Sequence, residues 1–198
     1  LAGANAVTKN KIAALSEKQA QESMQTLFPG AQFKEERYPA DATSSVFPFL
    51  YYRAEKDGQL EGYIFTTSAK GYGGDVSVMT AVTADGKIKA VKILDVSNET
   101  PGLGQNAAKE DFYGQLTGLS AESGISLNKT SPDAGKNEIA PVTGATITSK
   151  AAKDAVNEAL RRYSQIIGEN AGAWEADGQP EAQNQPETAE TEGGENEK

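Results

Sequence analysis

The 198-residue chain contains no cysteine and no histidine. Without cysteine it has no disulfide, no thiolate site for zinc or an iron–sulfur cluster, no thioether attachment for haem and no cysteine nucleophile. Without histidine it lacks an imidazole base, a Ser-His-Asp triad and an imidazole ligand for haem. Any redox cofactor of this chain must therefore be organic and held by oxygen atoms and backbone groups.

Long apolar runs are also missing, since no stretch reaches the ~18 apolar residues that a membrane span requires. The chain begins at Leu1 rather than at a methionine, which suggests a trimmed or processed product. Residues 1–7 are mostly small and apolar. On their own they indicate either the last turns of a longer apolar segment or an unstructured start.

The net charge of −9 belongs to the C-terminal end of the chain. Residues 169–198 carry nine acidic side chains and one basic side chain, whereas residues 1–168 carry 19 acidic and 18 basic ones. A nearly neutral body does not favour nucleic-acid binding, which needs a net positive face. The end segment is rich in Glu, Gln, Pro, Gly and Asn, and Trp174 is its single large apolar residue. We therefore predict an acidic disordered tail over residues 169–198, because so little apolar surface cannot offset the entropy of ordering.

The rest of the chain has the length of one domain, and its patterning predicts an α+β fold. Apolar residues at helical spacing predict a helix over residues 9–28, before Pro29-Gly30, and a longer one over residues 149–167. A short helix is expected near residues 107–116. Asp57-Gly58 and Asp85-Gly86 each mark a hairpin turn. The strands of these two hairpins are expected at residues 50–55, 60–67, 76–82 and 88–96. We predict antiparallel hairpins with the N-terminal and C-terminal helices packed on the sheet.

The segment from Pro141 to Lys150 places four hydroxyl residues and a glycine ahead of the long helix. Helix N-termini leave backbone N–H groups free and carry a partial positive charge, so this turn suits a phosphate. Helix capping by Thr148 or Ser149 is the competing interpretation, and the residues by themselves favour it over anion binding. The spacing is not that of a P-loop, which ends in Gly-Lys-Ser/Thr.

Two glycine-containing loops are the other candidates. In the loop 98–105, Pro101 restricts the backbone and two glycines loosen it, so the loop can present N–H groups, although a plain turn has the same composition. Glu99 has no obvious second carboxylate or base to act with. The loop 71–75 resembles a broken dinucleotide fingerprint without the strand and helix that such a motif needs. Its Tyr72 suits either stacking on a flat ring or exposure to solvent.

Together, the Gly71-Tyr72-Gly73-Gly74, Glu99-Thr100-Pro101-Gly102-Leu103-Gly104 and Thr143-Gly144-Ala145-Thr146 segments resemble the FMN-binding domain family. The resemblance is nearest to G subunits of Rnf-type ion-translocating oxidoreductases and more distant to C subunits of sodium-pumping NADH:quinone oxidoreductases. It covers most of residues 1–167. It implies an FMN-binding domain over residues 9–168, preceded at residues 1–8 by the end of an N-terminal membrane anchor.

The resemblance implies covalent FMN, esterified through its phosphate to Thr146 by a separate flavin transferase that consumes FAD. It implies neither a metal site nor a catalytic side chain. The cofactor-binding residues it indicates, besides Thr146, are Thr143, Gly144, Ala145, Thr148, Ser149 and Lys150 near the phosphate, and Tyr72, Glu99, Thr100, Gly102, Leu103 and Gly104 near the ring. The chain departs from the family's attachment motif at one position. The motif often has an aspartate three residues before its first hydroxyl residue. Here that position is Ala140, and Glu138 is the nearest carboxylate.

The function implied is that of an electron-transfer flavoprotein subunit. It would work in a membrane complex that couples ferredoxin:NAD electron transfer to Na⁺ or H⁺ translocation, with its domain on the extracytoplasmic side. Its partners would be the other membrane subunits and the flavin transferase. Two alternatives stay open: a standalone extracytoplasmic FMN-domain electron carrier, and a non-redox module tethered at the cell surface that binds a phosphorylated ligand.

Overall fold

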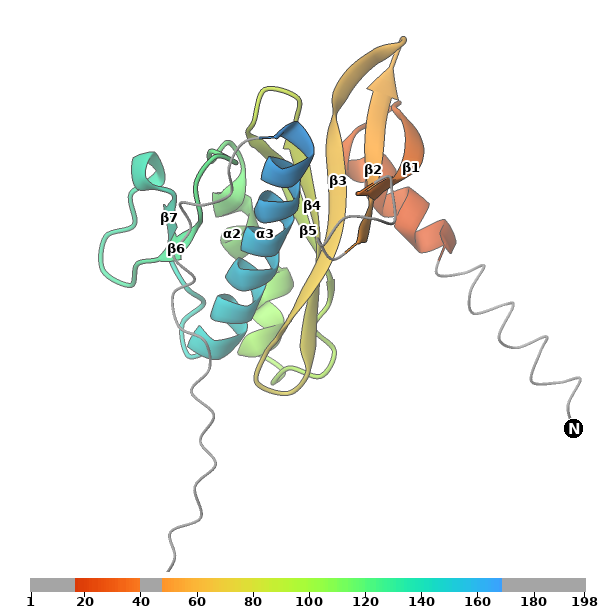
Figure 1. The fold of residues 1–198 in the computed structure, drawn as a ribbon. Helices are drawn as coiled ribbons and strands as arrows, with labels where there is room; N and C mark the ends of the chain where they lie inside the picture. The colour runs from red at the N-terminus through yellow and green to blue at the C-terminus, as the bar shows by residue number, and fades with distance from the viewer. Residues whose placement is uncertain (1–16, 40–47, 169–198) are drawn as a thin grey trace, which may run out of the picture.

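The computed structural model of the chain describes residues 17–39 and 48–168 (Figure 1). The predicted anchor end at residues 1–8, the first turns of the predicted N-terminal helix and the predicted acidic tail lie outside the described residues. Among the residues described, no helix combines the length and the apolar character that crossing a membrane needs.

A five-stranded antiparallel sheet forms the centre of the fold, with each strand beside its neighbour in the sequence. Its strands are β1 (Gln32–Tyr38), β2 (Phe49–Lys56), β3 (Gln59–Lys70), β4 (Asp75–Thr83) and β5 (Ile88–Asp95). Both predicted hairpins are present, as β2–β3 and β4–β5. At the first turn Asp57 and Gly58 both have positive φ, 52° and 77°, as a type I′ turn requires.

The first strand, β1, was not predicted. Among the described strands it lies at one edge of the sheet and pairs with β2 alone, and most of its residues are exposed. Its sequence QFKEERY therefore has none of the apolar alternation by which a half-buried strand is identified. A second sheet, the parallel pair β6 (Ser126–Leu127) and β7 (Glu138–Ile139), was also not predicted, because two-residue strands are too short for any periodicity.

Helices pack on both faces of the large sheet. The N-terminal helix, described over residues 17–27, covers one face, and α3 (Thr146–Ile167) lies across β3 and β4 on the other (Figure 1). Neighbouring strand residues point to opposite faces: Ile64 packs in the core beneath the N-terminal helix, together with Phe28, while Phe65 packs in the core that contains α3. The predicted α+β architecture, with its N-terminal and C-terminal helices on the sheet, is confirmed.

The short helix predicted near residues 107–116 is present as three consecutive pieces. They are η1 (Gly104–Ala108), α2 (Glu110–Tyr113) and η2 (Gly114–Leu116), with η3 (Ala134–Lys136) following later in the chain. Their buried side chains, Ala107, Phe112 and Leu116, join the core beneath α3. The segment between β5 and α3 is thereby held against the same core as the long helix.

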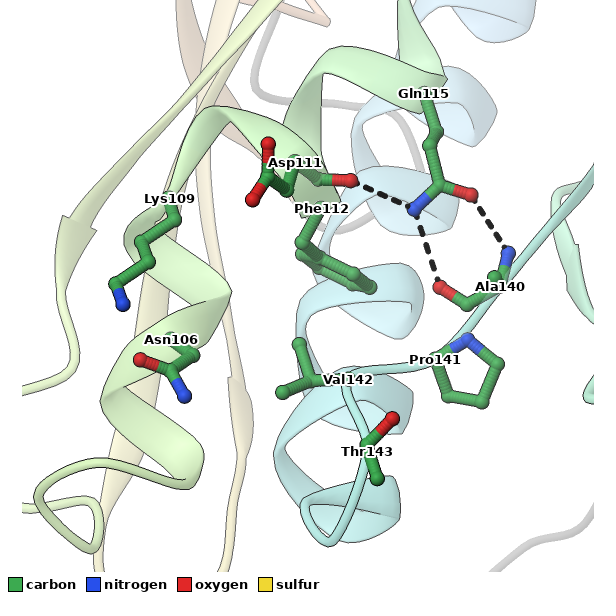
Figure 2. Close-up of a pocket in the computed structure, with 9 residues that line it drawn as sticks. All are labelled: Asn106, Lys109, Asp111, Phe112, Gln115, Ala140, Pro141, Val142 and Thr143. Carbon is green, nitrogen blue, oxygen red and sulfur yellow. Dashed lines mark hydrogen bonds between the residues drawn. The ribbon is translucent and has the colours of Figure 1, made fainter.

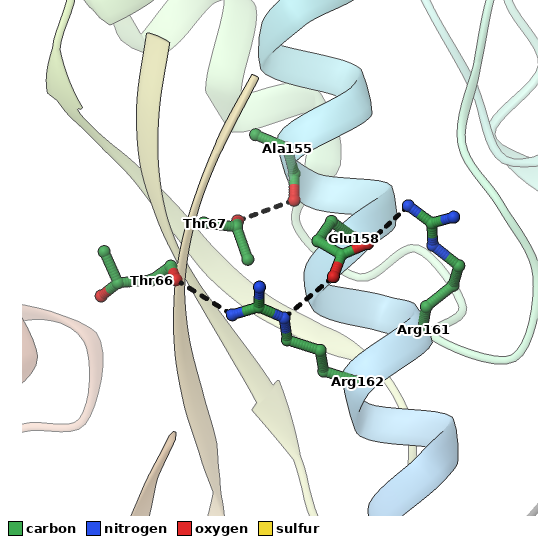
Figure 3. A network of polar contacts seen from close by, with 6 residues as sticks. All are labelled: Thr66, Thr67, Ala155, Glu158, Arg161 and Arg162. Atoms are coloured by element: carbon green, nitrogen blue, oxygen red, sulfur yellow. Dashed lines mark hydrogen bonds and ion pairs between the residues drawn. The ribbon is translucent and has the colours of Figure 1, made fainter. Parts of the chain in front are cut away.

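Polar contacts hold the middle and the end of α3 to β3 (Figure 3). The buried Thr67 hydroxyl donates to the carbonyl of Ala155 at 2.7 Å. Arg162 donates to the carbonyl of Thr66 at 3.4 Å and pairs with Glu158 at 3.0 Å. Its guanidinium also lies 5.1 Å from the ring centroid of Phe49 on β2, so one side chain joins the helix to two strands.

Replacing Arg162 with Ala should lower the free energy of unfolding by about 1 kcal/mol, because the cation–π contact and the bond to β3 are lost together. Arg161 is the matched control, because its ion pair with Glu158 lies at the surface and its replacement should cost less than about 0.5 kcal/mol. Urea denaturation measures both values. Equal losses in the two variants would contradict the anchoring role of Arg162.

The Tyr51 hydroxyl donates to the Glu36 carboxylate at 2.8 Å. Burial, followed by this bond, raises the pKa of Tyr51 from 10 to about 12. Because the folded-state pKa lies above the unfolded one, the stabilisation is fully present below pH 10 and is lost as the pH rises to about 12. The free energy of unfolding should therefore fall more steeply over this range in the wild type than in Tyr51→Phe. Parallel pH profiles in urea denaturation would refute this.

Candidate functional site

Three loops far apart in the sequence meet in one pocket of about 440 Å³ at the start of α3. We call it the Thr146 pocket. It lies between the loop before β4, the loop after β5 and the first turn of α3. Its lining consists of Tyr72, Thr100, Leu103, Gly104, Gly144, Ala145, Thr146, Ile147 and Thr148. All of these except Ile147 were predicted from the sequence as cofactor-binding residues.

The first turn of α3 is open toward the pocket. Ala145 occupies the N-cap position, and no side chain of the described residues makes a capping hydrogen bond there. The first N–H groups of this 22-residue helix therefore keep their capacity to bind an acceptor. Thr146 is the first helical residue and is exposed. This turn has the geometry of an anion site.

Capping by Thr148 or Ser149, which the residues alone favoured, is wrong. The helix starts three residues earlier than predicted, so both residues lie inside its first turns. The Thr148 hydroxyl donates to the Glu99 carboxylate instead. The Ser149 hydroxyl donates to the carbonyl of Ala145 and accepts from the N–H of Val142, both at 2.9 Å. Both hydroxyls hold neighbouring segments in place.

Glu99 lies beneath the pocket and does not line it. Its side chain is buried, with 3% of the residue exposed. One carboxylate oxygen accepts from the N–H groups of Gly73 at 2.9 Å and Gly74 at 3.3 Å, and the other accepts from Thr148. This single carboxylate therefore links the glycine-rich loop, its own loop and the start of α3.

Large apolar side chains surround the mouth of the pocket. Tyr72 is 72% exposed, Ile147 54% and Leu103 44%, and all three line the pocket. An apolar rim beside a polar helix start suits a flat ring system that is linked to a phosphate. Sequence reasoning missed Ile147, whose signal is an apolar residue on the exposed side of an amphipathic helix.

The other predicted residues have different positions. Gly102 lies in the same loop as Leu103, outside the lining, while Ser149 is buried behind the pocket and Lys150 is exposed on α3. Thr143 lines a neighbouring pocket of about 350 Å³ between α2 and the segment that leads to α3 (Figure 2).

Gln115 fixes the segment that leads into the Thr146 pocket (Figure 2). Its amide oxygen accepts from the N–H of Ala140 at 2.8 Å, and its amide nitrogen donates to the carbonyls of Ala140 at 3.3 Å and Asp111 at 3.1 Å. Glu138 is engaged elsewhere, because its carboxylate accepts from Asn128 at 2.9 Å and from the N–H of Asp133 at 3.2 Å.

Comparison with known proteins agrees with this geometry. Residues 71–161, which include all three pocket loops, match the family model described as the FMN-binding domain. The chain is 30% identical over 171 residues to the G subunit of an ion-translocating oxidoreductase complex from Cereibacter sphaeroides, covering 82% of this chain and 76% of that protein. The chain belongs to the G-subunit family of ion-translocating oxidoreductase complexes. The predicted resemblance to the FMN-binding domain family is confirmed.

Other G subunits are more similar over a shorter length. Identity is 38% over 118 residues with the G subunit of the proton-translocating ferredoxin:NAD(+) oxidoreductase complex of Clostridium ljungdahlii, covering 60% of this chain and 62% of that one. It is 40% over 116 residues with the Na(+)-translocating counterpart of Acetobacterium woodii, covering 58% and 55%. This chain thus spans less than two thirds of either relative.

A solved structure shares the fold. It is the C subunit of a Na(+)-translocating NADH-quinone reductase from Parabacteroides distasonis, with a TM-score of 0.53 and 24% identity over 61% of this chain and 63% of that chain. The predicted distant likeness to C subunits therefore holds at the level of the fold.

The contact between the glycine-rich loop and Asn98 predicts a large effect of Gly73→Ala in this G-subunit domain. A Cβ at this position would lie 1.8 Å from the Asn98 carbonyl oxygen, so backbone must move. We expect a loss of about 2 kcal/mol or more in the free energy of unfolding. Gly114→Ala is the control, because its Cβ would meet only Glu110 Cγ at 3.4 Å. Similar urea midpoints for both variants would disprove the close packing.

Proposed function

We propose that this G-subunit homologue carries FMN as a phosphoester on Thr146 and passes electrons within a membrane complex. The observation that carries the proposal is the position of Thr146. The residue is exposed, it begins an uncapped 22-residue helix, and it lines a pocket with an apolar rim. A cofactor with a phosphate at one end and a flat apolar ring at the other matches this arrangement.

The attachment is a phosphoryl transfer from FAD, carried out by a separate flavin transferase. The Thr146 hydroxyl oxygen attacks the phosphorus on the riboflavin side of the pyrophosphate. The new bond joins this oxygen to phosphorus, the pyrophosphate bond breaks, AMP leaves, and the hydroxyl proton is released. Because a hydroxyl is the acceptor, the chain needs neither cysteine nor histidine for this link.

The chain itself supplies binding and orientation, while the bound flavin supplies the redox chemistry. The phosphodiester keeps one negative charge, which the free N–H groups of α3 stabilise by ~0.3–1 kcal/mol. Gly144, Ala145 and Thr148 would hold the phosphate, and Lys150, exposed in the first turns of α3, would supply a cation. Tyr72 and Leu103 line the pocket, so they would hold the ring and would keep water from part of it.

The remaining predicted residues also divide into those near the phosphate and those near the ring. Thr143 and Ser149 would support the phosphate side through the backbone leading into α3. Thr100 and Gly104 would form the wall beside the ring, and Gly102, outside the lining, would shape the loop that carries Leu103. Glu99 acts from beneath the pocket.

The complex is one that couples ferredoxin:NAD electron transfer to ion movement. The names of the relatives from Clostridium ljungdahlii and Acetobacterium woodii support this, and they specify protons for one and Na⁺ for the other. The proposal therefore includes either ion. We further propose that the domain lies on the extracytoplasmic side, held by an N-terminal anchor and working beside the other membrane subunits.

The intact mass of protein made together with the flavin transferase tests the attachment. Wild type should be heavier by one FMN less one water, and Thr146→Ser should be modified as well because it keeps a hydroxyl. Thr146→Val, which has the same shape without a hydroxyl, should show the unmodified mass. An unmodified wild type, or a modified Thr146→Val, would refute the proposal.

A further inference from the structure

A single residue, Gly104, lies between the Glu99 carboxylate and the Thr146 pocket. A Cβ built on Gly104 would lie 2.8 Å from Thr148 Oγ1 and 2.9 Å from both Cβ and Oε2 of Glu99. Gly104 lines the pocket, so only a residue without a side chain fits between the pocket and the carboxylate.

The hydrogen-bond partners of this buried carboxylate among the described residues are neutral donors. They are the N–H groups of Gly73 and Gly74 and the Thr148 hydroxyl. None of the ion pairs formed by the described residues includes Glu99. A charge without a counter-ion in a buried position is screened much less than a surface charge, so its field extends into the pocket.

We propose that Glu99 is a positioning residue that also lowers the midpoint potential of the flavin in the Thr146 pocket. The proposal rests on the proposed function. The carboxylate holds the glycine-rich loop against the start of α3, because it accepts hydrogen bonds from two backbone N–H groups of that loop and from the Thr148 hydroxyl. Its negative charge would oppose the addition of electrons to a flavin ring held in the Thr146 pocket, so reduction would become less favourable.

Two nearly isosteric variants separate the charge from the geometry. In Glu99→Gln the amide oxygen can accept from Gly73 and Gly74, and the amide nitrogen can donate to the Thr148 oxygen, so the bonds survive and the charge is removed. In Thr148→Val the charge stays but loses its hydroxyl donor, and its field in the pocket becomes stronger.

Spectroelectrochemical titration of the flavin-loaded proteins should give shifts of opposite sign. We expect the midpoint of Glu99→Gln to rise by about 30 mV or more, a tenfold change in the equilibrium of a two-electron couple. The midpoint of Thr148→Val should fall. Glu158→Gln is the control on the same helix, about 18 Å along the axis from Thr146, and should match the wild type.

A second measurement needs no flavin. In the unmodified protein, hydrogen exchange of the Gly73 and Gly74 amides should be at least tenfold faster in Glu99→Ala than in the wild type. Glu99→Gln should keep the wild-type protection, because its amide oxygen still accepts from both groups. Equal exchange in all three proteins would overturn the positioning role, whether or not the wild type carries flavin.

The remaining outcomes are distinguishable from a failure of the proposed function, which an unmodified wild-type mass reveals. A flavin-loaded Glu99→Gln with the wild-type midpoint would overturn the tuning role. So would shifts of the same sign in Glu99→Gln and Thr148→Val. If the transferase modifies the wild type but neither of these variants, the hydrogen-bonded pair of Glu99 and Thr148 is required for flavin attachment, and the tuning role is likewise overturned.

Discussion

The candidate site depends on the three hydrogen bonds of one buried carboxylate. Glu99 accepts from Gly73, Gly74 and Thr148, which lie 26, 25 and 49 residues away in the sequence. Three segments that are far apart in the sequence are thereby held together around the Thr146 pocket. Because the carboxylate is buried and each of its partners would otherwise lose a hydrogen bond, separating the segments is costly. The pocket is preformed for this reason.

The rest of the fold keeps these segments in register. The glycine-rich loop joins β3 to β4, the Glu99 loop follows β5, and α3 packs on β3 and β4. The hydrogen bond from the Thr67 hydroxyl to the Ala155 carbonyl fixes the position of α3 along β3. Since α3 is a rigid rod of 22 residues, fixing its middle also fixes its first turn, where Thr146 is exposed. The sheet thus orients a site that no strand residue lines.

Sequence reasoning was most successful where local chemistry decides the structure. The Asp-Gly turns specified both hairpins, and the apolar stripe specified α3. The sequence pattern did not predict β1, whose strand conformation is stabilised by pairing with β2, and it placed the start of α3 too late. Thr148 and Ser149 are residue types that commonly cap helices. In the folded protein their hydroxyls instead donate to Glu99 and to the carbonyl of Ala145. Ile147 was missed because it lies on the exposed side of α3, outside the apolar stripe by which core positions are identified.

The sequence by itself determined the classes of cofactor that the chain excludes, the α+β pattern and the family, because these follow from residue types and their local order. Only the tertiary structure decided that Glu99 lies beneath the pocket, that Thr143 faces a different pocket and that α3 begins uncapped at Thr146. Burial and hydrogen-bond partners are set by segments that are remote along the chain. The role of a carboxylate or a hydroxyl therefore emerges only once those segments have been packed together.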